Sequence, residues 1–409
     1  MSEHPISAPV EERFNLSKLG FLPLALLVTG LFFTGLSLAW GYCGDRTQFA
    51  FSWLFAFMVC FTLCAGCLFW VLLHHALDAD WSVVVRRVPE TIASLFFPWM
   101  LLAFIPIALL RKELFVWWTV LPGADHLLDH KSGFLNHGFF WVRAALYFGG
   151  FGLLGWLLRK NSVAQDGDGN VHLSILQRRT AYVGIPFFAV SITFAAIDWM
   201  MSLNYHWFST MFGVYVFAGV AGSSMALMIL VSNLLKAGGY LKNVMTVEHN
   251  HIMGKLLFAF VIFWAYVSFS QYMLYYYANI PEETIWFVHR NTGSWHEVSI
   301  FLVFAHFFIP FIMLLTQPAK RNPYRITFAA IWYLGVHVLD LYWIIMPQLQ
   351  LRHAGAGAVP TGFHPQILDF TCLIGLLALL TYAFLRKLPQ AALFPIRDPR
   401  LYESVTLVN

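Results

Sequence analysis

The chain has 409 residues, of which 59% are hydrophobic and only 11% are charged, whereas about a quarter of the residues in an average soluble protein are charged. This composition excludes a soluble globular enzyme and, with forty phenylalanines and sixteen tryptophans, predicts an all-α integral membrane protein with aromatic belts. The formal net charge of +4 is small, and we interpret it as a bias of the loops, not as a nucleic-acid-binding surface.

Ten apolar stretches are long enough to cross a bilayer as helices, which takes about 20 residues each. They cover residues 19–41, 49–73, 88–110, 134–158, 180–203, 208–235, 252–278, 297–316, 325–347 and 365–386. Short polar loops separate them, so neighbouring spans are expected to pack antiparallel. We expect one transmembrane domain over residues 18–388, between tails at 1–17 and 389–409.

The distribution of basic residues predicts the orientation of the chain. Eighteen lysines and arginines fall on the side of the N-terminus and six on the opposite side. Because basic loops are retained in the cytoplasm, both termini are expected to be cytoplasmic.

The seventh span, residues 252–278, carries polar groups at both of its ends. Glu248, His251 and Lys255 share one face at its start, because residues three and four apart are neighbours on a helix. Gln271 and three successive tyrosines lie towards its other end. We therefore expect this helix to form one wall of a polar route through the membrane.

Ionisable side chains inside other spans extend this route. Each costs at least ~2.5 kcal/mol to place at the bilayer centre, so each is a functional candidate. The predicted proton route has a cytoplasmic half and an outer half: Glu90, Glu248, His251 and Lys255 in the first, and Arg143, Asp198, His306, His337, Asp340 and Asp369 in the second. His337 and Asp340 share a helix face, so the carboxylate can orient the imidazole or exchange a proton with it.

Two other interpretations of these residues stay open. Arg143 and Asp198 lie on neighbouring spans and can form a purely structural ion pair. A quinol needs a proton acceptor and an apolar slot, and the outer half offers a candidate quinone site at His137, Asp198 and Gln271.

Redox centres of the chain itself are not expected. His306 and His337 lie on adjacent spans, as two axial ligands of a haem would, but two histidines are a weak signal. The five cysteines lack the spacing of iron–sulfur or zinc sites, so no metal site is predicted.

Three stretches resemble one known family: LHHALDADWSVVVRRVPETI (73–92), the segment from Glu248 to Lys255 with GKLLFAF (254–260), and SFSQYMLYYYANIPEET (268–284). They are similar to the NrfD/polysulfide-reductase-like membrane subunits of bacterial alternative complex III, a quinol:cytochrome c or quinol:oxidase oxidoreductase. The chain looks like the smaller (ActF-type) of the two such subunits. The resemblance covers residues 18–388, and the third stretch is its most specific part.

The resemblance implies two four-helix bundles, spans 2–5 and 6–9, flanked by spans 1 and 10. It implies a bacterial inner-membrane location and three kinds of partner: a larger NrfD-like sister subunit, a periplasmic iron–sulfur subunit and c-type cytochromes. Haem and iron–sulfur centres would then reside only on the partners, and this chain would contribute a proton route and a quinone site.

Two functions outside this class remain as alternatives. Ten spans with intramembrane charges are compatible with a secondary transporter. The chain can also be a purely structural membrane anchor whose buried charges only hold helices together.

Overall fold

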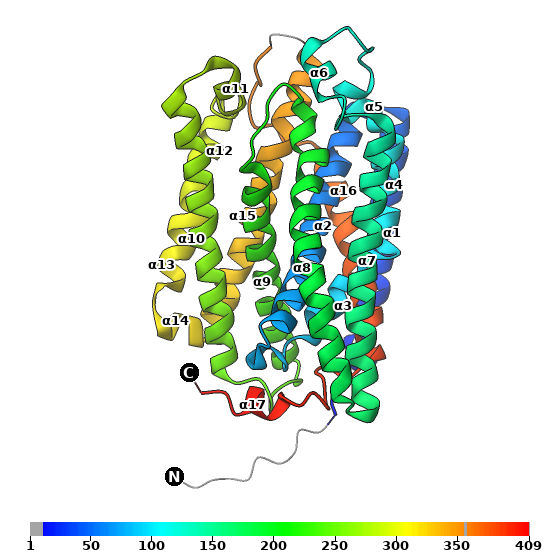
Figure 1. The fold of residues 1–409 in the computed structure, drawn as a ribbon, viewed down its shortest axis with the longest axis vertical. Coiled ribbons are helices and arrows are strands. Elements are labelled where there is room, and N and C mark those ends of the chain that lie inside the picture. Colours follow the sequence, from blue (N-terminus) through cyan, green and yellow to red (C-terminus); the bar gives the residue numbers. More distant parts are fainter. Residues whose placement is uncertain (1–10, 356–357, 409) are drawn as a thin grey trace.

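The computed structural model describes residues 11–355 and 358–408, and this part of the chain is almost entirely helical (Figure 1). It contains ten helices long and apolar enough to cross a membrane, which makes the chain a multi-pass membrane protein by length and composition. The all-α class and the ten spans expected from the sequence are confirmed. The only β pairing in the described part is an isolated bridge between Arg13 and Ala392.

The spanning segments follow the predicted order. They are α1 (Leu22–Cys43), α2 (Arg46–Ala76), α3 (Arg87–Ala93) with α4 (Trp99–Leu109), α7 (His137–Asp168), α8 (Val171–Trp199), α9 (Phe212–Ala237), α10 (Val247–Ala278), α12 (Trp295–Leu302) with α13 (Ile309–Leu315), α15 (Pro323–Ala354) and α16 (Ile367–Lys387). Short helices lie outside them: α5 (Arg111–Leu114), α6 (His126–Lys131), α11 (Pro281–Arg290), α14 (Gln317–Arg321) and α17 (Leu401–Val405).

Several helices are longer than their apolar stretches. The predicted fourth span ends at residue 158, whereas α7 continues through polar residues to Asp168. Gly169 then stops α7 with a left-handed backbone (φ 68°), and the Asn170 side chain caps the start of α8 by accepting from the His172 amide. Apolarity marks only the part of a helix that is suited to the bilayer interior, so it misses such polar extensions.

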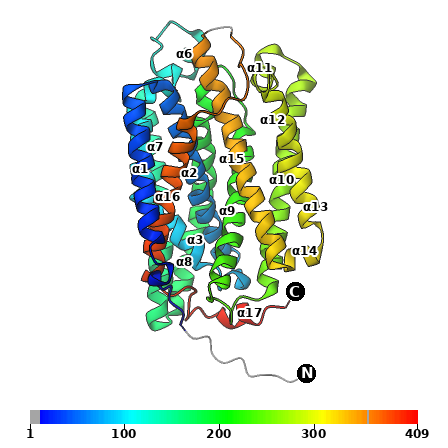
Figure 2. The same ribbon diagram turned by 180° about the vertical axis from the view of Figure 1, so that it is seen from behind.

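Helix α2 lies at the centre of the bundle. Its apolar window is 89% buried, whereas that of α1 is 11% buried. α2 packs against α8, α9 and α16, while α1 packs chiefly on α16. The α1–α16 pair runs along one side of the molecule, and α10 and α13 run along the other (Figures 1 and 2). Gly66 permits the close approach of α2 to α9, because a Cβ there would lie 2.3 Å from the Val220 carbonyl oxygen.

The two ends of the chain are tied together at one end of the bundle, which we call the tail end (residues 11–19 and 388–408) (Figure 1). The Leu393 amide donates to the Glu12 carbonyl over 2.8 Å, and Asp398 pairs with Arg86 at the start of the third span. We call the opposite end, where α6 and α11 lie, the far end (Figure 1).

The eighth span changes its helical geometry in the middle. Residues Val303–Phe308 form a π-helix between α12 and α13. Pro310 follows and has no N–H to donate to the carbonyl four residues earlier, that of His306, so the regular α-helical ladder cannot continue there. π-Helical turns occur frequently at functional sites, and this one carries His306.

Candidate functional site

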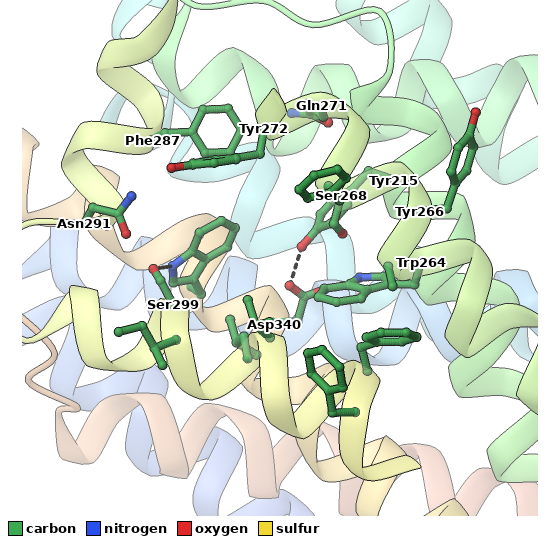
Figure 3. A pocket seen from close by; sticks show the side chains of 18 of the residues that line it. Tyr215, Trp264, Tyr266, Ser268, Gln271, Tyr272, Phe287, Asn291, Ser299 and Asp340 are labelled. Carbon is green, nitrogen blue, oxygen red and sulfur yellow. Dashed lines mark hydrogen bonds between the residues drawn. The ribbon is translucent and has the colours of Figure 1, made fainter. Parts of the chain in front are cut away.

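A cavity of about 1000 Å³ lies between α9, α10, α11, α12 and α15 (Figure 3). Its wall is largely aromatic, with contributions from Tyr215, Trp264, Tyr272, Trp286, Phe287 and Trp343. Tyr266, Phe269 and Ile300 also line it and are exposed on the outside of the bundle. The cavity therefore reaches the apolar surface, and a molecule dissolved in the bilayer has access to it.

Asp340, near the middle of α15, is the one acidic residue among those that line this cavity. It is buried and accepts hydrogen bonds from the Tyr215 hydroxyl and, over 3.3 Å, from Trp264 Nε1. Figure 3 shows Tyr215 and Asp340 pointing towards each other. No lysine or arginine of the described chain lies within ion-pair distance of Asp340. Its charge is thus held only by neutral donors.

His306 lies beside Asp340 without a hydrogen-bond partner in the described structure. Its ring stacks on that of Trp264, with centroids 3.8 Å apart, and contacts the Tyr333 ring at 4.8 Å. It is fully buried, and both ring nitrogens lack a partner. An unpaired buried polar atom costs about 1–3 kcal/mol, so this position carries a cost that packing alone does not explain.

The tautomer of neutral His337 follows from its contact with Thr62. The Thr62 hydroxyl donates its only proton to the Val59 carbonyl (2.9 Å). It must therefore accept from His337 Nε2, which lies 3.0 Å away. With its proton on Nε2, the ring presents an unprotonated Nδ1, and this buried atom has no partner in the described structure.

His306, His337 and Asp340 converge on one point. One ligating atom from each lies within 4.8 Å of the other two, and all three residues are buried. His337 and Asp340 thus lie near each other, as their shared helix face predicts, and His306 approaches them from another span. Two imidazoles and a carboxylate with free lone pairs are groups that can hold a proton or a metal cation.

Polar groups also line the cavity farther along α10. Gln271 is buried, and its Oε1 has no partner among the described residues; the same holds for Ser268 Oγ (Figure 3). On α11, Arg290 is buried and donates to the carbonyls of Trp286, Trp343 and Ile344. Burial disfavours the charged form and holds the pKa of this guanidinium well below its ordinary value.

Arg143 and Asp198 form a closed pair elsewhere, between α7 and α8. Arg143 Nε and Nη2 donate to the two carboxylate oxygens of Asp198 over 2.8 and 2.7 Å. The Tyr147 hydroxyl donates to the same carboxylate, and Arg143 Nη1 donates to the Phe134 carbonyl. This bidentate, buried geometry is that of the structural ion pair left open by the sequence.

Asp369 forms a third, separate cluster at the first turn of α16. It accepts from Ser52, from Gln48 over 3.1 Å and from Tyr342 over 2.9 Å, in addition to the Gln366 amide. A polar cavity of about 490 Å³ adjoins it at the far end, lined by Gln48, Tyr342, Met346, Leu349, Gln350 and Gln366 among others. Four donors satisfy this carboxylate.

The predicted cytoplasmic half lies at the tail end. The side chain of Glu90 is inaccessible to solvent and forms ion pairs with Arg86 and Arg87. Asp398 in the C-terminal tail also pairs with Arg86, so the tail covers this cluster. Sequence reasoning did not foresee this cover, because it depends on where the tail folds.

At the start of α10, Glu248 pairs with Arg321 over 2.8 Å and lies 3.6 Å from His251 Nδ1. Lys255, one helical turn further along α10, is exposed. Of the three residues predicted to share a face, Glu248 and His251 thus form a partly buried pair, whereas Lys255 is exposed.

The three residues of the predicted quinone site do not meet. Gln271 lines the large cavity, and Asp198 belongs to the pair with Arg143. His137 is exposed and stacks on Trp118, with ring centroids 4.2 Å apart. The structure instead brings Gln271 into the same cavity as Asp340 and Tyr215.

Neutral residues complete the central cluster, and sequence reasoning missed them. Thr62, Tyr215 and Trp264 make the hydrogen bonds described above, yet threonine, tyrosine and tryptophan are ordinary residues of a membrane helix. Their positions within the predicted spans were the only available signal.

A scan against protein-family models finds no match to this chain, and a search of curated proteins finds no similar sequence.

Proposed function

We propose that this chain is an integral subunit of a bacterial quinol-oxidising respiratory complex of the alternative complex III type, and that its task is to pass protons. One observation supports the proposal most: His306, His337 and Asp340 converge in the middle of spanning helices beside a cavity open to lipid. A charge that only joins helices needs an opposite charge, as Asp198 has. Asp340 has none within ion-pair distance in the described chain.

Proton passage follows from the chemistry of the cluster. The Asp340 carboxylate and the two imidazoles can each take up and release a proton, and they lie within 4.8 Å of one another, so a proton can pass between them. The proposed route leads from Glu248 and His251 at the tail end to this cluster. Asp369, beside the polar far-end cavity, lies at its outer end.

The finer organisation belongs to the same proposal. Both termini are cytoplasmic, so the tail end faces the cytoplasm, and spans 2–5 and 6–9 form two NrfD-like four-helix bundles flanked by spans 1 and 10. The partners are a larger sister membrane subunit, a periplasmic iron–sulfur subunit and c-type cytochromes. These partners carry the haem and iron–sulfur centres, and the electrons of the quinol pass to them.

The test is Asp340→Asn in the assembled complex. Asparagine keeps the shape of the side chain but cannot take up a proton. We expect the proton-to-electron ratio, or turnover if the two are obligatorily coupled, to fall about tenfold or more, as for other proton-transfer groups. Lys255→Gln is the control, because Lys255 lies outside the bundle interior. Unchanged turnover and unchanged proton stoichiometry in Asp340→Asn would refute the proton route.

Purification decides between this class and the two alternatives. A chain that co-purifies with multihaem cytochromes and a second membrane subunit supports the proposal. A stable lone protein that binds a polar solute favours a secondary transporter. A complex whose turnover and proton stoichiometry survive every substitution in the cluster reduces the chain to an anchor.

The cavity favours a second candidate function, quinol binding by this chain itself. Its volume, aromatic wall and opening to lipid suit a ring with an isoprenoid tail. Asp340 lies where a quinol hydroxyl could release a proton, and Gln271 and Ser268 offer unpaired polar atoms for the ring oxygens. The two protons of the quinol would go to this cluster and its two electrons to a redox centre on a partner.

Gln271→Leu tests this candidate. Leucine removes the polar atoms and keeps the volume, so we expect the KM for quinol to rise several-fold while kcat changes less. Photoaffinity labelling with an azido-quinone should mark α10 or α12. Labelling confined to the sister subunit, with an unchanged KM, would exclude quinol binding here.

A further inference from the structure

The geometry points to a transition-metal site at His306, His337 and Asp340, of the class that takes Zn²⁺ through two imidazoles and one carboxylate. This inference goes beyond the proposed function, because metal binding requires neither quinol nor turnover.

The first support is the arrangement of donor atoms. One ligating atom from each residue lies within 4.8 Å of the other two, so small side-chain movements bring them to the separation that metal–ligand bonds of about 2.0–2.2 Å require. Two nitrogens and one oxygen on one side of an ion, with other positions open, is the arrangement of zinc catalytic centres and of two-histidine, one-carboxylate iron centres.

The second support is the orphaned nitrogens. Both ring nitrogens of His306 and Nδ1 of His337 are buried without a partner in the described structure. Because His337 Nε2 donates its proton to the Thr62 hydroxyl, Nδ1 on the other side of the ring is unprotonated and has a free lone pair. Free imidazole lone pairs inside a protein are the donors that borderline metals such as zinc prefer.

The third support is the shell around the donors. Metal-binding histidines usually donate their other N–H to a fixed acceptor, and metal-binding carboxylates are themselves hydrogen-bonded. Here Thr62 holds His337, and Tyr215 and Trp264 hold Asp340. Among the described residues, no lysine or arginine forms an ion pair with Asp340, so a divalent ion would compensate the buried carboxylate.

The large cavity brings further polar groups close to one of the donors. Asp340 lies on its wall, and the other polar residues of that wall include Gln271, Ser268 and Asn291 (Figure 3).

The experiment uses the full-length chain in detergent, with whatever subunits accompany it. The preparation is treated with a chelator, titrated with Zn²⁺ and desalted, and bound zinc is counted by plasma mass spectrometry. We expect about one zinc per chain more in the native protein than in His306→Gln or His337→Gln. Thr62→Val, which removes only the support of His337, should weaken binding about tenfold, and Thr62→Ser should restore it.

A matched control removes a different histidine pair. His126 and His130 lie on the short helix α6, with ring centroids 4.5 Å apart. The double variant His126→Gln/His130→Gln should keep the full zinc content. If this variant loses the zinc and His306→Gln keeps it, the metal binds at the surface and the inference is overturned.

X-ray absorption on the zinc-loaded native protein needs no variant. It should show imidazole nitrogen and carboxylate oxygen ligands at about 2.0–2.1 Å. A sulfur shell, or failure of the native protein to retain any zinc, overturns the inference. Neither measurement involves quinol, so a negative result leaves the proton route standing, and loss of proton coupling in Asp340→Asn says nothing about the metal.

Discussion

Two buried aspartates, Asp198 and Asp340, illustrate opposite uses of the same residue in one membrane protein. Asp198 accepts hydrogen bonds from two nitrogens of Arg143 and from the Tyr147 hydroxyl. Asp340 accepts hydrogen bonds only from the neutral side chains of Tyr215 and Trp264, and it lies beside a cavity and two histidines. The first arrangement is complete and holds α7 to α8. The second leaves basic groups ready for a further proton or ion.

Neutralising the two acids should therefore have unequal effects on stability. Asp198→Asn leaves Arg143 buried without its counter-charge, and breaking a buried ion pair costs about 3–5 kcal/mol. Asp340→Asn removes a buried carboxylate that has no basic partner in the described chain. Its amide oxygen still accepts from Tyr215, but its amide nitrogen cannot accept from Trp264, so the free energy of unfolding should fall by at most about 1–3 kcal/mol. Thermal unfolding in detergent measures both.

The matched double variant Arg143→Met/Asp198→Leu should regain most of the stability, because apolar side chains often replace a buried ion pair without loss. If Asp340→Asn proves as destabilising as Asp198→Asn, the contrast between the two sites is wrong.

The support of His337 gives the next largest effect. Thr62→Val leaves the His337 Nε2 proton without an acceptor, at a cost of about 1–3 kcal/mol. Thr62→Ser keeps the hydroxyl and should behave like the native chain. NMR of the labelled imidazole should show a change of tautomer in Thr62→Val and none in Thr62→Ser; an Nε2-protonated ring in both would show that Thr62 does not fix it.

The smallest effect is expected at Lys255. The sequence places it in the predicted route, but it is exposed on the outside of α10. Surface substitutions of this kind change stability by less than about 0.5 kcal/mol, so Lys255→Gln should match the native chain in thermal unfolding. A fall of several kcal/mol in the free energy of unfolding of Lys255→Gln would show that this lysine makes interactions important for the fold.

Apolar length was enough to predict the ten spans, and pairs of residues on neighbouring spans were partly predictable. Arg143 and Asp198 are the simplest case, because each has few alternatives within the membrane. The sequence places His306 and His337 on adjacent spans, but it does not show that His306 meets both His337 and Asp340, since this depends on the π-helix before Pro310 and on which way α12 and α13 face.

Exposure was harder still to predict from the sequence. Periodicity places Glu248, His251 and Lys255 on one broad face, yet a rotation of α10 by a fraction of a turn decides which of them face the interior. The cover over Glu90 depends on a tail some 300 residues later in the chain, which no local pattern reveals.

The pairing of α1 with α16 bears on how the protein is made. α1 is synthesised first, but its chief neighbour is the last spanning helix. Until the ribosome has released α16, α1 lacks its main packing partner and lies in the bilayer with few contacts to the other helices. Completion of the fold is therefore a late event in biogenesis, and a chain truncated before residue 367 should leave its first helix free to drift or to be captured by an insertase.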